Sequence, residues 1–325
     1  MTSISIVDIS KISLNKPDPT VDDYKEVSLQ IKKCFEEIGF MYISHHGIDQ
    51  EVITEAMKAS MDFFKLEESV KNKTRKGEEY QGWVEQGREI FEQDSDGNVA
   101  ALEVRETYDL KNISSAGIFP DKDCPQLRQC LVRLSSEAKL LSRRLMRSIS
   151  LSLGCDLQYL DSVHVGMLTE GIDNSTDNAT TLRSIHYPPI PDDLKDNASI
   201  IRCGEHSDYG TITLLFQDEL GGLEVKDVEG RWIDAKPVPG TILVNVGDSL
   251  EAVSGGKFPS TRHRVMVPES EFRRRTLRQS MAFFVHPDEA VVCEPLSGPD
   301  PRYPPVTARQ HLENRFAATY AGGLA

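Results

Sequence analysis

Three residues with metal-binding side chains lie in strand-like segments of the C-terminal half of the chain. His206 and Asp208 are separated by one residue in "HSDYG", and His263 follows in "STRHRVMVP", 263 − 206 = 57 positions later. Strand alternation puts His263 on the face opposite to Arg262 and Arg264, which favour solvent, so His263 is expected to point inward. Two histidines and one carboxylate with open positions are the ligand set of an O₂-activating non-haem Fe(II) site. A hydrogen-bonded core histidine is the alternative for His263.

A second polar pair interrupts an apolar strand-like run further along the chain. In "TLRQSMAFFVHP", Arg278 and Ser280 share a face with Ala282 and Phe284. A guanidinium that faces the interior is costly unless an anion meets it. It matches a carboxylate with two parallel hydrogen bonds, and Ser280 adds a hydroxyl at the same depth. The pair predicts a bound carboxylate, with a salt bridge to one of the chain's own 51 acidic residues as the alternative.

The order and spacing of these motifs carry a family resemblance. The H-x-D motif, the distal histidine and the R-x-S motif, 278 − 263 = 15 residues later, together resemble the Fe(II)/2-oxoglutarate-dependent oxygenases. The arrangement is most similar to the branch that includes isopenicillin N synthase and the plant-type dioxygenases. The similarity continues through "CFEEIGFMYISHHGI", "IHYPPIP" and "PVPGTILVNVGDSLEAVSGGKFPSTRHRV". It covers most of the chain and is weakest over residues 67–117.

The resemblance implies roles for six residues. The iron ligands would be His206, Asp208 and His263. The distal carboxylate of 2-oxoglutarate would be bound by Arg278 and Ser280, and Tyr187 would help to hold the same co-substrate. One departure is Ile185, where many relatives have an asparagine, so a slightly different co-substrate orientation is expected, and His186 is a candidate for a polar role. The arginine-rich insertion at 269–275 makes Arg274 or Arg275 an alternative clamp, although neither has a serine at i+2.

The implied reaction uses Fe(II), 2-oxoglutarate and O₂ to oxidise a small molecule, with release of succinate and CO₂. Hydroxylation, desaturation and oxidative cyclisation are all open, and an amino-acid-like substrate is one option. A first alternative is an oxidase of the isopenicillin N synthase type that needs no 2-oxoglutarate. A non-catalytic 2-oxoglutarate-binding protein is a second. A zinc hydrolase accepts the same ligands but leaves Arg278 and Ser280 without a function.

Five further residues are weaker candidates for substrate contacts, because they lie near the metal motif or in the irregular N-terminal segment. They are Arg183, Arg202, Arg105, Trp83 and Tyr108. The arginines have a structural or surface charge as their alternative role. His45 and His46 are expected to be structural because adjacent strand residues face opposite ways. Cys203 is expected to serve packing, since soft thiolate ligands suit other metals.

Composition excludes several partners. The chain has 325 residues and a formal charge of −14, so nucleic acid and anionic membranes are poor partners. Six cysteines without a CxxC pair are typical of reduced thiols in a cytoplasmic protein. The N-terminus "MTSISIVDIS" does not resemble a signal peptide, and no run of about 18 apolar residues is present. No oligomeric state is predicted.

Helices are expected in the N-terminal half and short strands beyond residue 160. Apolar spacing predicts helices over 20–40, 50–65 and 126–153, and a final helix over 305–320 that could cover the cavity mouth. Short β-rich runs between turns indicate an antiparallel sandwich or barrel. With the resemblance, this predicts a mixed α+β fold with a double-stranded β-helix (jelly-roll) core. The expected parts are an N-terminal helix and strand region at 1–120, a support helix at 121–160 and the catalytic core at 161–325, integrated into one domain.

Overall fold

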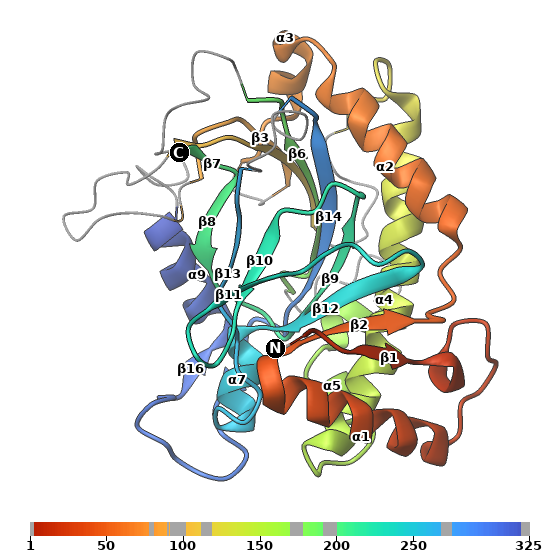
Figure 1. Ribbon diagram of the computed structural model, residues 1–325, viewed down its shortest axis with the longest axis vertical. Helices are drawn as coiled ribbons and strands as arrows, with labels where there is room; N and C mark the ends of the chain where they lie inside the picture. Colours follow the sequence, from red (N-terminus) through yellow and green to blue (C-terminus); the bar gives the residue numbers. More distant parts are fainter. Residues whose placement is uncertain are drawn as a thin grey trace.

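The computed structural model describes residues 3–77, 81–89, 91, 102–111, 119–169, 178–190, 200–267 and 275–319. Two β-sheets face each other, and helices pack on the outside of the larger sheet (Figure 1). Three sequence expectations lie wholly or partly outside the described residues: the irregular segment 67–99, the insertion 269–275 and Tyr320. Within the described part of the chain, no helix has the length and apolar character needed to cross a membrane.

In the described part of the chain, eight strands form the large sheet and four form the small one. The large sheet has the order β1 (Ile6–Asp8), β2 (Phe40–Ser44), β12 (Thr241–Val246), β9 (Ile212–Gln217), β14 (Arg278–Val285), β6 (Thr181–Tyr187), β5 (Glu106–Lys111) and β3 (Gly82–Val84). The small sheet has the order β11 (Trp232–Asp234), β10 (Leu223–Lys226), β13 (His263–Val265) and β8 (Cys203–His206).

The chain winds between the two sheets as it runs from β6 to β14. Strands β6, β9, β12 and β14 belong to the large sheet, and β8, β10, β11 and β13 belong to the small one. Neighbours among these strands pair antiparallel. This winding is that of a double-stranded β-helix, so the predicted jelly-roll core is confirmed. Strands β1 and β2 extend the large sheet, with β1 parallel to β2 and β2 antiparallel to β12.

Three long helices cover the outer face of the large sheet. They are α1 (Val21–Ile38), α2 (Gln50–Phe64) and α4 (Pro125–Ser152), close to the predicted ranges (Figure 1). Helix α1 begins at a capping box formed by Thr20 and Asp23. It ends at Gly39, whose φ is 70° and where a Cβ would lie 2.2 Å from the carbonyl oxygen of Pro259. Only glycine fits there, and β2 follows directly.

The remaining elements are short, apart from the last helix. They are η1 (Ser10–Ile12), α3 (Glu68–Lys71), η2 (Asn72–Thr74), β4 (Leu102–Glu103), α5 (Tyr159–Ser162), α6 (Val165–Leu168), β7 (Ile200–Ile201), α7 (Asp248–Ser254), β15 (Val292–Cys293), β16 (Val306–Thr307) and α9 (Ala308–Thr319). Strand β4 pairs with β7, and β15 pairs with β16. The final helix α9 lies within its predicted range.

Side-chain alternation on β14 separates two apolar interiors. Met281 and Phe283 face the helices and belong to the main core between helices and sheet. Ala282 belongs to a second cluster between the two sheets, and Phe284 packs against that cluster. Because Arg278 and Ser280 share the parity of Ala282, they also face the space between the sheets, as predicted.

Candidate active site

A cavity of about 330 Å³ lies between the two sheets. Strands of both sheets line it, and residues of α9 form part of its wall. Eight of the eleven candidate metal, co-substrate and substrate residues lie on its surface: His206, Asp208, His263, Arg278, Ser280, Tyr187, Arg105 and Arg183. The fold therefore brings together segments that are up to 280 − 105 = 175 residues apart in the chain.

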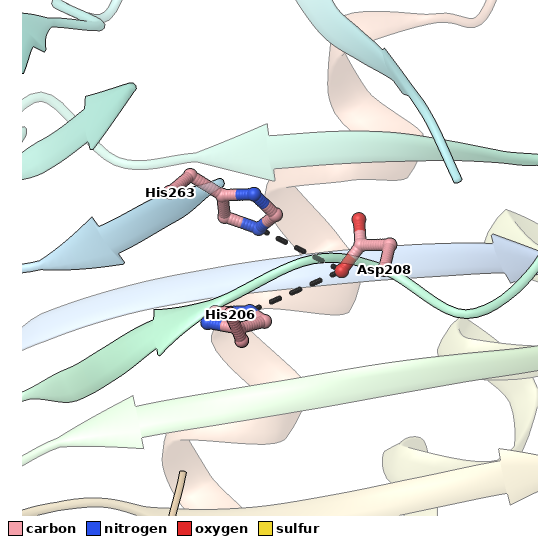
Figure 2. Close-up of side chains that lie close together, drawn as sticks. All are labelled: His206, Asp208 and His263. Atoms are coloured by element: carbon pink, nitrogen blue, oxygen red, sulfur yellow. Dashed lines mark ion pairs between the residues drawn. The ribbon is translucent and has the colours of Figure 1, made fainter. Parts of the chain in front are cut away.

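His206, Asp208 and His263 converge at one point of the cavity wall (Figure 2). His206 ends β8 and His263 begins β13, and the register of these antiparallel strands places the two histidines opposite each other. Asp208 Oδ1 lies 3.9 Å from His206 Nε2 and 3.6 Å from His263 Nε2. One candidate ligand atom from each residue lies within 4.8 Å of the others. This spacing fits a single metal ion bound by two imidazoles and one carboxylate.

The outer nitrogens of both imidazoles are already engaged. His206 Nδ1 lies 2.7 Å from the carbonyl oxygen of Gly204, and His263 Nδ1 lies 3.1 Å from that of Thr261. A carbonyl only accepts, so each Nδ1 carries the proton and each Nε2 keeps its lone pair toward the centre. Metal-binding histidines are commonly oriented by such a hydrogen bond from the second ring nitrogen.

The two oxygens of the Asp208 carboxylate make different contacts. Its Oδ2 accepts hydrogen bonds from Thr213 Oγ1 (2.6 Å) and Asn245 Nδ2 (2.7 Å), which leaves Oδ1 facing the histidines. Burial acts to raise the pKa of Asp208, but His263 and His206, with these two hydrogen bonds, hold it below its usual value. Sequence reasoning missed Thr213 and Asn245. A signal for Asn245 was present in the sequence, because it is a polar residue within the apolar run "TILVNV".

Burial favours the neutral form of His206, and aromatic rings lie against both imidazoles. Burial, followed by the neighbouring His263, lowers the pKa of His206 to about 3. The His206 ring stacks on Phe91 with centroids 4.5 Å apart, and Phe40 meets His263 edge-on at 5.5 Å. A neutral imidazole in an apolar frame suits a divalent metal, because the ligand must be deprotonated. Burial raises the pKa of the nearby Cys203 thiol to about 12, so it remains a packing group, in line with its expected role.

Arg278 lines the same cavity, with 1% of the residue's surface exposed. Its Nε donates to the carbonyl oxygen of Gly221 (2.7 Å), its Nη1 lies 3.5 Å from Ser280 Oγ, and its guanidinium lies 4.7 Å from the centroid of the Tyr187 ring. Among the described residues, no carboxylate pairs with Arg278. The alternative role of Arg278, an internal salt bridge, therefore lacks a carboxylate in the described part of the chain. A guanidinium that faces a cavity can instead donate hydrogen bonds to the carboxylate of a bound ligand.

The neighbours of Tyr187 on β6 divide between the two faces of the sheet. Ile185 lines the cavity and offers no polar group to a ligand. His186 faces the helices, where its Nδ1 lies 3.1 Å from Glu106 and its ring stacks on Phe64. The expected polar role of His186 is therefore a contact with Glu106, away from the cavity.

Two of the predicted substrate-contact arginines line the cavity but are bound to the protein's own carboxylates. Arg183 donates to both oxygens of Asp109 (2.7 Å each) and to Glu89 (3.0 and 3.1 Å). Arg105 Nη2 lies 3.1 Å from Glu103 and 3.4 Å from Glu89. These buried pairs place positive and negative side chains next to one another along this part of the cavity wall. The sequence did not indicate Asp109, Glu89 and Glu103 as partners, because they come from other segments of the chain.

The other three predicted substrate contacts do not line the cavity. Trp83 and Tyr108 are buried in the main core on the helix side of the large sheet, because the parity of β5 sends Asp109 inward and Tyr108 outward. Arg202 is fully buried, with its guanidinium 5.9 Å from the Tyr187 ring centroid and its Nη2 bonded to the carbonyl of Thr276. All three therefore lie off the surface of this cavity, and their contact with substrate stays a prediction.

Comparison with known proteins identifies the family. Residues 178–287 match the 2OG-Fe(II) oxygenase superfamily, and residues 4–128 match the family described as non-haem dioxygenase in morphine synthesis N-terminal. The chain is 30% identical to homoarginine-6-hydroxylase 2-ODD-C23 of Glycine max over 308 residues, which are 91% of this chain and 88% of that protein. It is 28% identical to a 1-aminocyclopropane-1-carboxylate oxidase of Dictyostelium mucoroides, over 87% of this chain and 82% of that one.

A solved structure agrees with the sequence comparisons. A full-length protein of Neurospora crassa, crystallised in complex with alpha-KG and thymine, superposes on this chain with a TM-score of 0.81. The two sequences are 28% identical, and the match covers 97% of this chain and 96% of that one. The chain therefore belongs to the 2OG-Fe(II) oxygenase superfamily, whose non-haem enzymes use Fe(II), 2-oxoglutarate and O₂ to oxidise small molecules.

Proposed function

We propose that this enzyme binds its iron and its co-substrate through two separate sets of residues at the wall of one cavity. The iron ligands are His206, Asp208 and His263. The distal carboxylate of 2-oxoglutarate is held by Arg278, Ser280 and Tyr187. The substrate is a small, amino-acid-like molecule that is oxidised at a C–H bond.

One observation carries this proposal. The His206–Asp208–His263 cluster and the buried Arg278, which has no carboxylate partner among the described residues, line the same cavity. A metal site explains the first group, and a ligand with a carboxylate explains the second. 2-Oxoglutarate satisfies both, because one end is a 2-oxo acid that can chelate a metal and the other end is a free carboxylate. A zinc hydrolase would leave Arg278 without a function.

The protein's own residues supply position and a dry environment. Thr213 and Asn245 hold one oxygen of Asp208 so that the other points to the metal position. Arg278 and Ser280 set the direction in which the co-substrate lies, and Phe40 and Phe91 exclude water beside the histidines. Bound iron with 2-oxoglutarate and O₂ supplies the oxidation itself, which yields succinate, CO₂ and the oxidised substrate.

Two further proposals concern the cellular compartment and the domain organisation of the enzyme. We place it in the cytoplasm, because the described cysteines are all free thiols. We propose that the segments 1–120, 121–160 and 161–325 act as one integrated domain. The pairing of β2 with β12 supports this, because it joins the N-terminal segment to the catalytic core in one sheet.

The testing experiment is an anaerobic titration of the metal-free protein with Fe(II) and then 2-oxoglutarate, followed by the visible metal-to-ligand charge-transfer band. We expect the band in the wild-type protein and its loss, with loss of turnover, in His206→Ala and Asp208→Ala. The exposed His45 provides the control, because His45→Ala should keep both. Near-normal turnover in Asp208→Ala would exclude the proposed ligand set. Iron binding without a band, together with oxidation that yields no succinate, would favour an oxidase that does not use 2-oxoglutarate.

A further inference from the structure

His286 is a buried polar side chain that the proposed chemistry leaves unused. It follows β14 in the segment "FFVHP", lines the cavity and has 9% of its surface exposed. Neither nitrogen of its ring has a hydrogen-bond partner among the described residues. Another buried histidine, His164, has both nitrogens bonded, to Leu160 O (2.7 Å) and to Thr211 Oγ1 (2.8 Å). A buried imidazole without partners that faces a cavity indicates a missing ligand group.

The position of His286 places that ligand on the substrate side. Arg278 and His286 both lie on the cavity face, at opposite ends of β14, because they are an even number of residues apart. Eight residues of strand span roughly 26 Å at about 3.3 Å per residue. The co-substrate clamp therefore occupies one end of the cavity wall and His286 the other. Burial lowers the pKa of His286 to about 4, so at neutral pH the ring offers one donor and one acceptor.

Charged side chains with long contacts to Glu289 lie on the cavity surface at this outer end. Glu289 lies 3.9 Å from Lys111 and 3.6 Å from Arg309, and Arg309 also pairs with Glu313 at 2.9 Å. The Arg309 side chain is 62% exposed, whereas those of Lys111 and Glu289 are 23% and 19% exposed. Pairs in the inner wall, in contrast, are short and buried, such as Lys76 with Asp109 at 2.6 Å. Charges 3.6–3.9 Å apart make no direct hydrogen bond, so Glu289 can exchange these two long contacts for the ammonium group of a ligand.

The signs of these charges select the ligand. Lys111 and Arg309 are cations, and Glu289 and Glu313 are anions, so the charges of these four described residues sum to zero. A ligand with a single charge that separates Lys111 from Glu289 would pair with one of them and leave the other without its former partner. A ligand with one positive and one negative group would pair with both. The apolar side chains of Phe284, Leu312 and Phe316 lie on the same cavity surface and can pack against the rest of the molecule.

We propose that the substrate is an amino acid that binds as a zwitterion at this outer end, with its ammonium group at Glu289 and its carboxylate between Lys111 and the imidazole N–H of His286. The C–H bond to be oxidised then lies on the part of the molecule that extends toward the metal cluster. This inference rests on the proposed function, and it defines which small molecules the same site accepts.

The test uses the anaerobic Fe(II)–2-oxoglutarate complex of the full chain and the change in its charge-transfer band when a substrate binds. The probes are the twenty standard amino acids, L-homoarginine and 1-aminocyclopropane-1-carboxylate, each beside its methyl ester and its N-acetyl derivative, with thymine as an uncharged comparison. We expect at least one amino acid to shift the band. Each blocked derivative should bind about tenfold or more weakly, because one charge-assisted contact is lost.

Three substitutions assign the two charges to residues. His286→Phe should weaken the free amino acid about tenfold but leave its methyl ester unchanged, and His286→Gln, which keeps an N–H donor, should restore part of the affinity. Glu289→Gln should weaken the amino acid but not its N-acetyl form. Glu294→Gln, an exposed change in the same segment, is the matched control. In every variant the band itself reports that metal and co-substrate are still bound.

The outcomes separate this inference from the proposed function. If the wild-type protein forms no band with Fe(II) and 2-oxoglutarate, the proposed function fails and the inference fails with it. If the band forms but no amino acid shifts it, or thymine alone does, only the substrate assignment is overturned. Esters and N-acetyl derivatives that bind as tightly as their parent amino acids would overturn it as well.

Discussion

The guanidinium of Arg315 in α9 contacts Ser207, the residue between the proposed ligands His206 and Asp208. Its Nη2 lies 3.2 Å from Ser207 Oγ and 3.3 Å from the Ser207 carbonyl oxygen. Arg315 Nη1 also lies 3.7 Å from Asp248, whose backbone N–H donates to the carbonyl of Asp208 (2.8 Å). Helix α9 therefore supports the metal loop as well as forming a wall of the cavity.

Removal of this contact is expected to weaken iron binding. Arg315→Ala should raise the dissociation constant for Fe(II) about tenfold, because residues that support metal ligands typically contribute about 10- to 100-fold to affinity. The measurement is an anaerobic competition titration with a chelator. Gln310→Ala on the same helix is the control, since among the described residues the side chain of Gln310 bonds to Asn314 of α9 and its backbone N–H to Thr307, which precedes the helix. Equal iron affinity in Arg315→Ala and the control would show that α9 does not support the metal loop.

The two residues behind Asp208 should matter for the same reason. Asn245→Ala and Thr213→Val each remove one hydrogen bond from Asp208 Oδ2, so the carboxylate can rotate away from the metal position. We expect each change to lower Fe(II) affinity about 10- to 100-fold in the same titration. The exposed Asn314 provides a control in Asn314→Ala. Wild-type affinity in both Asn245→Ala and Thr213→Val would mean that the Asp208 orientation is set by the backbone alone.

Arg278 should affect the co-substrate more than the metal. Arg278→Ala is expected to raise the KM for 2-oxoglutarate about 10- to 100-fold, because a charge-assisted pair contributes roughly 1.5–3 kcal/mol. Ser280→Ala removes one neutral hydrogen bond and should raise the KM only about two- to tenfold. Succinate release measured against 2-oxoglutarate concentration gives both values. An unchanged KM in Arg278→Ala would place the carboxylate clamp elsewhere.

The buried histidines predict how stability depends on pH. Burial lowers the pKa of His164 to about 4, whereas in the unfolded chain it titrates near its ordinary 6.5. Between these values the unfolded state binds one more proton, so the free energy of unfolding falls as pH decreases from 6.5. The slope from His164 is roughly 1.4 kcal/mol per pH unit, and above about pH 6.5 this loss is absent.

Urea unfolding of the metal-free protein between about pH 7 and pH 5 measures this slope. Carboxylates with lowered pKa values, such as Asp109, respond at lower pH and therefore contribute little in this window. His164→Gln should unfold with a shallower pH dependence than the wild-type protein, even if it is less stable at both ends. The same slope in both proteins would show that His164 is not buried as a neutral group.

Local patterns in the sequence were sufficient for the residue types of the site and for an antiparallel sandwich or barrel, whereas the jelly-roll core was predicted only together with the family resemblance. The inward face of His263 and the shared face of Arg278 and Ser280 follow from strand alternation, which depends only on position along one strand. Helix signals placed α1, α2 and α4 within a few residues, because capping and periodicity are local as well. These features needed no knowledge of the rest of the molecule.

Contacts between distant segments were decided only by the tertiary structure. The register that sets His263 opposite His206, the pairing of Arg183 with Asp109 and Glu89, and the outward face of Tyr108 all depend on which strands lie side by side. A sequence shows that an arginine is charged, but whether it meets a substrate or a carboxylate of its own chain depends on which group the fold brings within about 3 Å of it. The sequence therefore determined the chemical groups of the site, and the tertiary structure determined which groups contact one another.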